Sequence, residues 1–461
     1  MSIFRAYDVR GIYGETINVQ DTLKTSFLFA RRCGRGGPLY VGRDNRRSSL
    51  PISLSVLAGI SAAGCQAVDI GMVPTPLLYF GVAHHKAKGG IMVTASHNPV
   101  SYNGLKLVVD RARPLTYETG IREIEQEYRT AGIDSTPDMV GEVMVDDIKD
   151  EYVNYITRDV RASKDIRVVI ELGSGTSGPV LEKVVDKLSL NATLLNPDPD
   201  PLFPNGMVNP AKQETMGGLT DAVRREGADL GIGLDVDADR VGVITRSGRF
   251  VFGDFLLAVL SRTVLKKHVG STVLLDVRAS KAVVDYITNL GGRVEFTRVG
   301  HSYIANAMLD GKFPLGGELS GHIYFKEGYY GYDDGIYCAV KLLELLSDEG
   351  RDLEEMLGEF EQTYPSPEIR VRAPEDSKFE IVKIIAEELR KRGVRTNAID
   401  GVRAELSNGW FSIRASNTEP ALVIRAEGYG PGDLKRMLDE VNSLISRAQL
   451  VEKEREPASS A

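Results

Sequence analysis

The sequence predicts a multidomain α/β protein that ends in a separate α+β module. The chain has 461 residues, which is too long for one compact core and suggests three or four domains. Up to about residue 350, short β-branched runs alternate with amphipathic stretches, as in repeated β-α units. The last part differs, because it shows a strand, a helix, three strands and a final helix.

The individual elements follow from local periodicity, since strands are short apolar β-branched runs and helices repeat apolar residues every three or four positions. We expect strands at Gly90–Thr94, Ile166–Glu171, Asp229–Leu234, Thr272–Asp276 and Val294–Thr297, and helices at Val180–Leu188, Asp254–Lys267 and Gly335–Leu346. In the last part we expect helices at Lys378–Arg392 and Pro431–Arg447, with three strands around Gly401–Ala426.

Polar or proline-rich stretches divide the chain into four pieces. These stretches lie near Val145–Asp150, around Ser247–Arg249 and at Tyr364–Glu368. They predict domains at residues 1–148, 149–248, 249–365 and 366–450. Residues 451–461 are charged and rich in small side chains, and we expect a flexible tail there.

Composition excludes several classes of protein. The 56 Lys and Arg residues against 64 Asp and Glu residues give a net charge of −8, which argues against non-specific binding to nucleic acid or anionic membranes. Cys33, Cys65 and Cys338 are widely spaced and form no C-x-x-C pair, so neither a disulfide framework nor a cysteine zinc site is indicated. With no apolar leader or spanning run, we expect a cytoplasmic protein.

Two motifs resemble known binding sites but lack residues that those sites require. The stretch Gly173–Gly178 fits G-x-G-x-x-G, but the next strand, Ala192–Leu195, ends in Asn196 where a dinucleotide site needs an acid. A tight glycine turn explains it better. The run Asp235–Asp239 begins like a calcium loop, yet arginines stand where the turn glycine and the closing glutamate belong.

The same acidic run does suit a different cation. Asp235, Asp237 and Asp239 directly follow an apolar strand, at the end of the strand where α/β sheets bind ligands. Three carboxylates this close repel one another unless a cation neutralises them, and oxygen ligands suit Mg²⁺. A solvated acidic turn is the alternative, although such a turn does not normally continue an apolar strand.

A second polar loop, Thr94–Pro99, also follows an apolar strand. It contains Ser96 and His97, and Lys106 comes shortly after it. Taken alone, Ser96 is as consistent with a capped turn as with a nucleophile.

Two further loops carry groups suited to a sugar phosphate. Glu318, Ser320 and His322 lie between glycines, where a carboxylate and a hydroxyl can bind sugar hydroxyls; a glycine-rich hairpin is the alternative. The loop Arg414–Pro420 combines a guanidinium with hydroxyl and amide groups, as phosphate sites do. Its alternative is a capped turn, and Arg425 beyond it is equally consistent with a solvent-facing side chain.

Together the four loops resemble the α-D-phosphohexomutase superfamily, in its phosphoglucomutase/phosphomannomutase branch. That family carries its phosphoserine in T-A-S-H-N-P, its magnesium ligands in D-x-D-x-D-R, its sugar contacts in G-E-x-S-G-H and its phosphate site in R-x-S-N-T-x-P. Each motif stands intact here, and the opening FRAYDVRG resembles the family's N-terminal signature, which adds Tyr7 and Arg10. The resemblance implies three similar α/β domains with mixed sheets and a smaller C-terminal α+β domain around a central cleft.

Two details of the motifs differ among relatives. Val236 fills a position that is more often glycine, which questions the geometry of the metal loop. Glucosamine-phosphate mutases usually have glycine where Asn417 stands and tend to have glutamine at Leu319. Both residues favour glucose and mannose phosphates, with a phosphoglucosamine mutase kept as the alternative.

The activity that the resemblance implies is exchange of a phosphoryl group between phospho-Ser96 and a hexose 1- or 6-phosphate of glucose or mannose. Glucose 1,6-bisphosphate or mannose 1,6-bisphosphate is then the intermediate and activator. A metal-dependent phosphatase and a non-catalytic sugar-phosphate binder remain as other classes, and the oligomeric state stays open. The sequence also leaves open which side chain moves the hydroxyl proton.

The implied roles are these. Mg²⁺ is bound by Ser96, Asp235, Asp237 and Asp239; the catalytic groups are Ser96, Lys106, Arg240, His301, His97 and Arg10; and the substrate is bound by Glu318, Ser320, His322, Arg414, Ser416, Asn417, Thr418, Arg425 and Tyr7.

Overall fold

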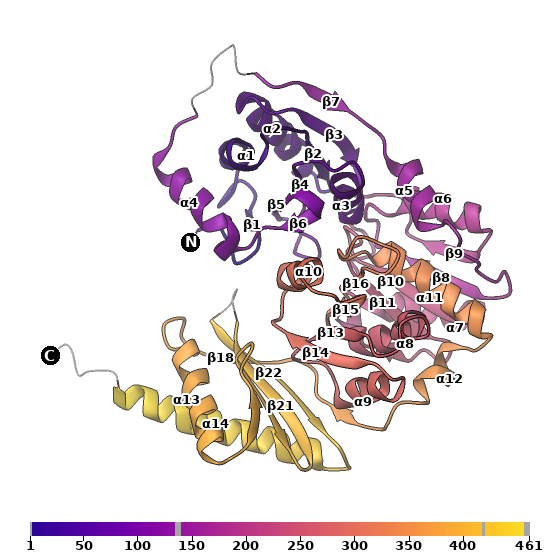
Figure 1. The fold of residues 1–461 in the computed structure, drawn as a ribbon, viewed down its shortest axis with the longest axis vertical. Coiled ribbons are helices and arrows are strands. Elements are labelled where there is room, and N and C mark those ends of the chain that lie inside the picture. Colours follow the sequence, from indigo (N-terminus) through magenta and orange to yellow (C-terminus); the bar gives the residue numbers. More distant parts are fainter. Residues whose placement is uncertain (1, 134–139, 417–419, 456–461) are drawn as a thin grey trace.

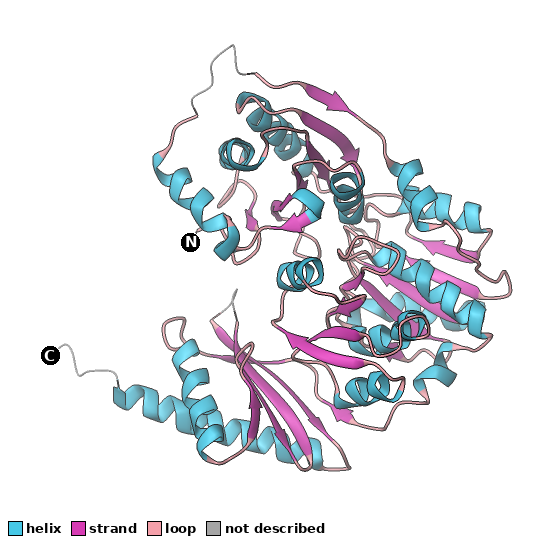
Figure 2. Cartoon of the chain, viewed as in Figure 1, coloured by secondary structure: helices cyan, strands magenta, loops and turns pink. Residues whose placement is uncertain are grey.

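The computed structural model describes residues 2–133, 140–416 and 420–455, which form four sheets with their helices. The four units follow one another around an open arc, so that the first and the fourth face each other (Figure 1). In the first three units helices and strands alternate, whereas in the fourth both helices lie on one side of the sheet (Figure 2). This arrangement confirms the predicted α/β fold with a separate α+β module.

The first sheet has the order β1-β5-β4-β2-β3-β7, with β6 paired to β5. It is mixed, because β2 runs parallel to β3 and β4 while β5 runs antiparallel to β4 and β1. The elements are β1 Val9–Ile12, α1 Val19–Cys33, β2 Leu39–Arg43, α2 Ser49–Ala62, β3 Ala67–Met72, α3 Thr75–His84, β4 Gly89–Val93, β5 Tyr102–Val109, β6 Arg113–Pro114, α4 Ile121–Thr130 and β7 Val143–Val145.

The second and third sheets are also mixed, with the orders β12-β11-β10-β8-β9 and β14-β13-β15-β16. The second unit contains α5 Lys149–Ile156, β8 Arg167–Glu171, α6 Gly178–Leu188, β9 Asn191–Leu195, α7 Gly217–Glu226, β10 Leu230–Leu234, β11 Val241–Thr245 and β12 Phe250–Val251. The third contains α8 Gly253–Leu265, β13 Thr272–Asp276, α9 Lys281–Asn289, β14 Arg293–Thr297, α10 His301–Asp310, β15 Leu315–Gly317, β16 Ile323–Phe325, α11 Gly335–Glu349 and α12 Leu353–Leu357.

The fourth sheet has the order β17-β22-β21-β20-β19, with β18 paired to β22, and it is antiparallel. Its elements are β17 Tyr364–Pro365, β18 Ile369–Arg372, α13 Lys378–Lys391, β19 Arg395–Asn397, β20 Val402–Leu406, β21 Gly409–Ala415, β22 Ala421–Gly428 and α14 Asp433–Arg455. Helix α14 is longer than the sequence predicts and takes in residues 451–455 of the expected tail.

The stretch Ser247–Arg249 is a hairpin turn between β11 and β12, not a linker. Gly248 has φ +89°, and the amide of Thr245 donates to the carbonyl of Arg249 at 2.9 Å. Small polar residues serve hairpin turns and linkers alike, so composition alone does not separate the two.

A large hydrophobic core runs through the first three units, the first unit has a second core of its own, and the fourth unit has a separate core. Two buried arginines of the fourth unit reach across to the turn after β13. Arg403 donates from Nη1 to the carbonyls of Val277 and Ala279 at 2.8 and 2.7 Å, and Arg425 donates to that of Arg278 at 2.8 Å. The fourth unit is therefore fastened by guanidinium–carbonyl hydrogen bonds at this turn.

In the part of the chain that the structure describes, no helix has the length and apolar character needed to cross a membrane.

Candidate active site

Ser96 lies in the loop that leaves β4 and is only 3% exposed. Its φ of +50° is unusual for a residue with a side chain, and such backbone conformations gather at functional sites. The hydroxyl of Thr94 accepts a hydrogen bond from the Ser96 amide at 2.9 Å and supports this conformation. The Ser96 Oγ then donates to Asp235 Oδ2 at 3.0 Å and lies 3.1 Å from His97 Nδ1.

Asp235, Asp237 and Asp239 follow β10 and are almost completely buried. Each offers a carboxylate oxygen within 4.8 Å of the others. The Oδ1 atoms of Asp237 and Asp239 are buried and have no hydrogen-bond partner among the described residues. Such orphaned buried oxygens fit a divalent cation that takes oxygen ligands.

The electrostatics of these three carboxylates also favour binding of a cation. Burial raises the pKa of Asp235 well above its usual range, and the charges of Asp239 and Asp237 raise it further. A bound divalent ion would let all three carboxylates ionise together.

The backbone of the acidic loop, Asp235–Asp239, does not need a glycine at Val236. The left-handed residue of the loop is Ala238, with φ +53°, whereas Val236 is buried and has no positive φ. The glycine turn after β8 supports this loop, because Thr176 donates from its amide and its hydroxyl to the carbonyl of Val236 at 2.9 and 3.0 Å. A Cβ on Gly175 would lie 2.5 Å from that same carbonyl oxygen. The turn that resembled a dinucleotide motif is thus a close backbone support of the acidic loop.

Two cations compensate the acidic cluster. Lys106, on β5, contacts Asp237 Oδ2 at 2.9 Å and also pairs with Asp239. Burial alone would lower the pKa of Lys106, but Asp237 and Asp239 raise it well above its usual range, so this amine is charged. The Arg240 Nε lies 3.7 Å from Asp235 Oδ2.

His322 connects Arg240 to an acid that sequence analysis missed. Arg240 Nε donates to His322 Nε2 at 2.8 Å, and His322 Nδ1 lies 2.7 Å from Asp333 Oδ2. Both His322 and Asp333 are buried, so the imidazole fixes the direction of the guanidinium. Asp333 follows a tyrosine-rich loop rather than an apolar strand, which is why strand ends gave no signal for it.

His301 begins α10 and stacks on His322, with ring centroids 5.5 Å apart. The ring of Tyr7 meets His301 edge to face at 5.0 Å. Burial, followed by the charge of Lys106, lowers the pKa of His301 well below its usual value, so this imidazole is neutral near pH 7. The pKa of His97 is also well lowered, first by Arg240 and then by burial.

In the loop between β15 and β16, the hydroxyl of Ser320 and the carboxylate of Glu318 are joined by a hydrogen bond. Ser320 Oγ donates to Glu318 Oε2 at 2.5 Å, and the amide of Gly300 donates to Glu318 Oε1 at 2.5 Å. Asp276 at the end of β13 accepts from the amide of Leu319 at 2.8 Å. The loop is therefore held in place before any ligand binds.

Arg414 is the penultimate residue of β21 and Ser416 begins the loop that follows it, while Asn417 and Thr418 lie outside the described residues. The structure does not join Arg425 to the Ser96 cluster. Arg425 is 1% exposed and lies 3.5 Å from Asp254 Oδ2, next to its bond with the Arg278 carbonyl.

Arg10 and Arg46 hold the loop that carries Ser96. Arg10, on β1, donates to Asn98 Oδ1 at 3.2 Å. Arg46 is buried and was not singled out from the sequence; it donates to the carbonyls of Ser96, Asn98 and Pro99 at 2.6, 2.7 and 2.8 Å.

Arg46 belongs to an Asp-x-Arg pattern that lies at the end of an apolar strand in two places. Asp44 and Arg46 directly follow β2, whereas Asp276 is the last residue of β13 and Arg278 follows it; both pairs read Asp-x-Arg at the end of an apolar strand. In both places the arginine Nε donates to the aspartate, at 3.1 and 3.0 Å. This repeat is the signal that would have found both arginines.

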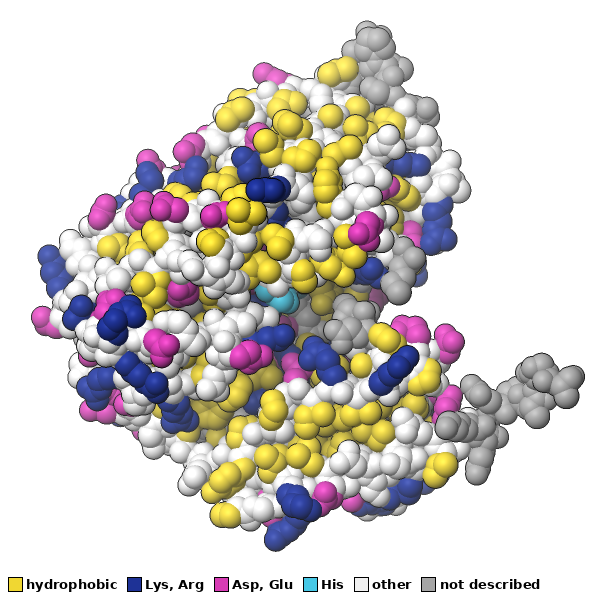
Figure 3. Space-filling model, turned by 180° about the vertical axis from the view of Figure 1, so that it is seen from behind, with side chains coloured by type: hydrophobic (Ala, Val, Ile, Leu, Met, Phe, Trp, Pro, Cys, Tyr) yellow, Lys and Arg dark blue, Asp and Glu magenta, His cyan; other side chains and the backbone are white. Residues whose placement is uncertain are grey.

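A hollow lies between the upper part of the molecule, which contains the first sheet, and the lower part, which contains the fourth (Figure 3). Lysine or arginine side chains gather at its lower rim, and a histidine side chain shows at its inner end. The hollow corresponds to the central cleft that the resemblance to the family implies.

Sequence models of four domains of one family match the chain in order. They are the phosphoglucomutase/phosphomannomutase α/β/α domains I, II and III, at residues 1–133, 150–248 and 252–364, and the C-terminal domain of the same family, at residues 368–444. The chain belongs to the phosphoglucomutase/phosphomannomutase family.

Individual family members resemble it over nearly their whole length. A phosphomannomutase/phosphoglucomutase of Pseudomonas aeruginosa is 37% identical over 445 residues, which cover 95% of this chain and 94% of that protein. A phosphoglucomutase of Neisseria meningitidis serogroup A is 32% identical over 449 residues, 96% of each. The crystal structure of a phosphoglucomutase/phosphomannomutase family protein from Burkholderia thailandensis superposes with a TM-score of 0.90 at 29% identity and covers 97% of both chains.

Proposed function

We propose that this chain interconverts the 1-phosphate and the 6-phosphate of glucose or mannose, with Ser96 as the group that accepts and donates the phosphoryl group. The observation that carries the proposal is the position of Ser96 Oγ, 3.0 Å from Asp235 and beside two carboxylates with free buried oxygens. Mutase activity at one site needs both a phosphoryl carrier and a charge-neutralising cation next to it.

We propose Mg²⁺ as that cation, held by Asp235, Asp237 and Asp239 together with the phosphoryl group on Ser96. The free Oδ1 atoms of Asp237 and Asp239 support this assignment. When bound, the ion neutralises charge on the transferring group and polarises its oxygens.

The transfer step is a displacement at phosphorus. A free hydroxyl of the hexose phosphate forms the new O–P bond as the bond from Ser96 Oγ to phosphorus breaks. The hydroxyl gives its proton to a base. Ser96 Oγ is the leaving group and takes up a proton to become the serine hydroxyl. Lys106 and Arg240 lie beside the acidic cluster, where their charges would stabilise the negative charge on the transferring group.

We propose His301 as the base for the sugar hydroxyl. A general base must be unprotonated near neutral pH, and burial keeps the His301 imidazole neutral while Lys106 stays charged. The contacts of Tyr7 and His322 with its ring hold it in one orientation. The raised pKa values of Lys106 and Arg240 keep those two side chains protonated, which favours His301 among the three.

The 1,6-bisphosphate formed in the first transfer must turn over before the second. We propose that Glu318 and Ser320 bind the sugar hydroxyls, that His322, whose two ring nitrogens face Arg240 and Asp333, orients Arg240, and that the loop beginning at Arg414 binds the phosphate that is not reacting. The residues Ser416, Asn417 and Thr418 of that loop are proposed to share this phosphate. In each half of the reaction a different phosphate would then face Ser96.

Glucose and mannose phosphates are favoured over glucosamine phosphate. The P. aeruginosa relative is named for both mannose and glucose, and the N. meningitidis relative for glucose. Turnover of glucose 1-phosphate, mannose 1-phosphate and glucosamine 1-phosphate, each with Mg²⁺ and a catalytic amount of the bisphosphate, tests this preference. Faster turnover of glucosamine 1-phosphate than of the other two would reverse it.

Replacing the proposed phosphoryl carrier tests the mechanism itself. We expect Ser96→Ala to abolish mutase turnover while substrate binding, measured by calorimetry, persists. Ser101→Ala, an exposed position in the same region, is the matched control and should keep its activity. Near-normal rates in Ser96→Ala, or no phosphate on Ser96 by peptide mass spectrometry after incubation with the bisphosphate, would contradict the proposal.

We also propose a reducing, cytoplasmic location. The three cysteines are free thiols, and burial raises the pKa of each of them. Such thiols are typical of proteins that do not rely on disulfides.

A further inference from the structure

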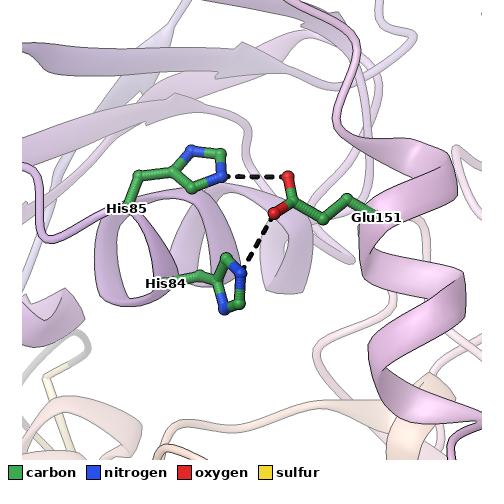
Figure 4. Close-up of side chains that lie close together, drawn as sticks. All are labelled: His84, His85 and Glu151. Atoms are coloured by element: carbon green, nitrogen blue, oxygen red, sulfur yellow. Dashed lines mark hydrogen bonds and ion pairs between the residues drawn. The ribbon is translucent and has the colours of Figure 1, made fainter.

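A cluster of side chains of the types that bind metals lies outside the Ser96 site. His84 is the last residue of α3, His85 follows it, and Glu151 lies in α5. The carboxylate of Glu151 lies between the two imidazole rings, so that each of its oxygens faces one ring (Figure 4). None of the three side chains takes part in the proposed phosphoryl transfer.

The ligand atoms converge closely enough for one ion. His84 Nε2 lies 3.0 Å from Glu151 Oε1, and His85 Nε2 lies 2.9 Å from Glu151 Oε2. One ligand atom from each residue lies within 4.8 Å of the other two. Ligand atoms around Zn²⁺ lie about 2.0–2.2 Å from the metal and so up to about 4 Å apart, which a small side-chain rotation achieves.

The far side of each imidazole is anchored by a tyrosine. The Tyr330 hydroxyl lies 2.7 Å from His84 Nδ1, and the Tyr40 hydroxyl lies 2.6 Å from His85 Nδ1. Histidines that bind metals usually use their second nitrogen in such a hydrogen bond, which fixes the ring and its tautomer. Both Nε2 atoms are therefore presented to the same point, next to a carboxylate.

We propose that His84, His85 and Glu151 form a site for Zn²⁺, with water at the fourth position. Two imidazole nitrogens and one carboxylate oxygen suit zinc, whereas the three aspartates of the Ser96 site offer oxygen alone and suit magnesium. The histidine side chains are 30% and 27% exposed, so an ion can reach them from solvent.

The position of this site gives zinc a structural role. The two histidines belong to the first unit and Glu151 to the second, while Tyr330 comes from the third. A shared ion would join α3 to α5 across the boundary between the units. The other end of α3 is fixed as well, because Thr75 donates from Oγ1 to Asp237 Oδ2 at 2.7 Å.

The test is a zinc titration of the full-length protein after removal of metals with a chelator. Equilibrium dialysis with metal analysis, in excess Mg²⁺, measures zinc bound per chain, and Co²⁺ serves as a visible-absorption probe of nitrogen ligation. Zinc that remains bound to the Asp237→Asn variant does not depend on the acidic cluster. His85→Gln and Glu151→Gln each remove one ligand, and His268→Gln, which removes an exposed histidine paired with Glu327, is the matched control.

We expect wild-type, Asp237→Asn and His268→Gln proteins to bind zinc at this site and to melt at a higher temperature with zinc present. His85→Gln and Glu151→Gln should lose that zinc and that rise in melting temperature, although all variants keep the wild-type circular dichroism spectrum. Tyr330→Phe should weaken zinc binding by about 10- to 100-fold. Equal zinc binding by wild type and both ligand variants would overturn the proposal, as would a wild-type protein that binds no zinc beyond the acidic cluster.

Discussion

Replacing Arg46 by glutamine is expected to loosen the loop that presents Ser96. The guanidinium is buried and donates to the backbone carbonyls of Ser96, Asn98 and Pro99, while its Nε pairs with Asp44 at 3.1 Å. A glutamine is shorter and has only two donors, so most of these acceptors would lose their partner.

The expected size of the effect follows from those bonds. Removing one partner of a buried ion pair costs about 3–5 kcal/mol, because the other charge stays buried. Asp44 keeps its hydrogen bonds from the Arg46 amide and from Ser49, so we place the loss at the lower end. A loss of about 3 kcal/mol corresponds to a local opening that is at least a hundredfold more frequent.

Native-state hydrogen exchange of the amides in residues 94–103 measures this opening directly, and mutase assays measure its cost to catalysis. We expect kcat to fall at least tenfold in Arg46→Gln with an unchanged pH profile, and to recover partly in Arg46→Lys, which keeps the charge. The neighbouring exposed Arg47→Gln is the control. A change of less than tenfold in the exchange rates of this loop, while the rest of the domain remains folded, would contradict this role of Arg46.

Two further predictions concern the charges around Ser96. Removing divalent cations with a chelator should stop mutase turnover and lower the melting temperature, because the buried carboxylates then repel one another; restored Mg²⁺ should reverse both, and an unchanged melting curve would argue against a metal at the aspartates. His301 should make stability depend on pH. Its folded pKa lies below the unfolded value of 6.5, so the stability it contributes is complete above pH 6.5 and is lost as the pH falls towards the folded pKa. Urea unfolding in Mg²⁺ at about pH 7.5 and about pH 5.5 should therefore differ less in His301→Gln than in the wild type, and an equal difference would contradict this origin.

The sequence predicts most of the fold because local periodicity decides most elements. Strand Thr272–Asp276 is confirmed with the same bounds, and helix Lys378–Arg392 differs by one residue. The acidic loop and the Ser96 loop were predictable because each follows the carboxyl end of an apolar strand, where α/β sheets bind ligands. Contacts such as Ser96 to Asp235 join different sheets, and no local pattern encodes them.

Residues whose roles depend on tertiary contacts were not predicted from the sequence. Asp333 matters through its contact with His322, and the surrounding tyrosines made its loop look purely structural. Arg425 does not face solvent but is buried against the carbonyl of Arg278, because a long guanidinium side chain can cross from one unit to another; its contact with the substrate phosphate stays a prediction. The Asp-x-Arg pairs were predictable in principle, since both lie at the carboxyl ends of apolar strands.

The attachment of the fourth unit has a consequence for the effect of salt. Its arginines bind neutral carbonyls, and Arg425 also the buried carboxylate of Asp254, in an interface where Arg403 and Arg425 are only 2% and 1% exposed. Mobile ions screen charge–charge attraction in solvent but hardly reach such hydrogen bonds. High ionic strength should therefore weaken capture of an anionic sugar in the open hollow long before it detaches the unit that forms one wall of it.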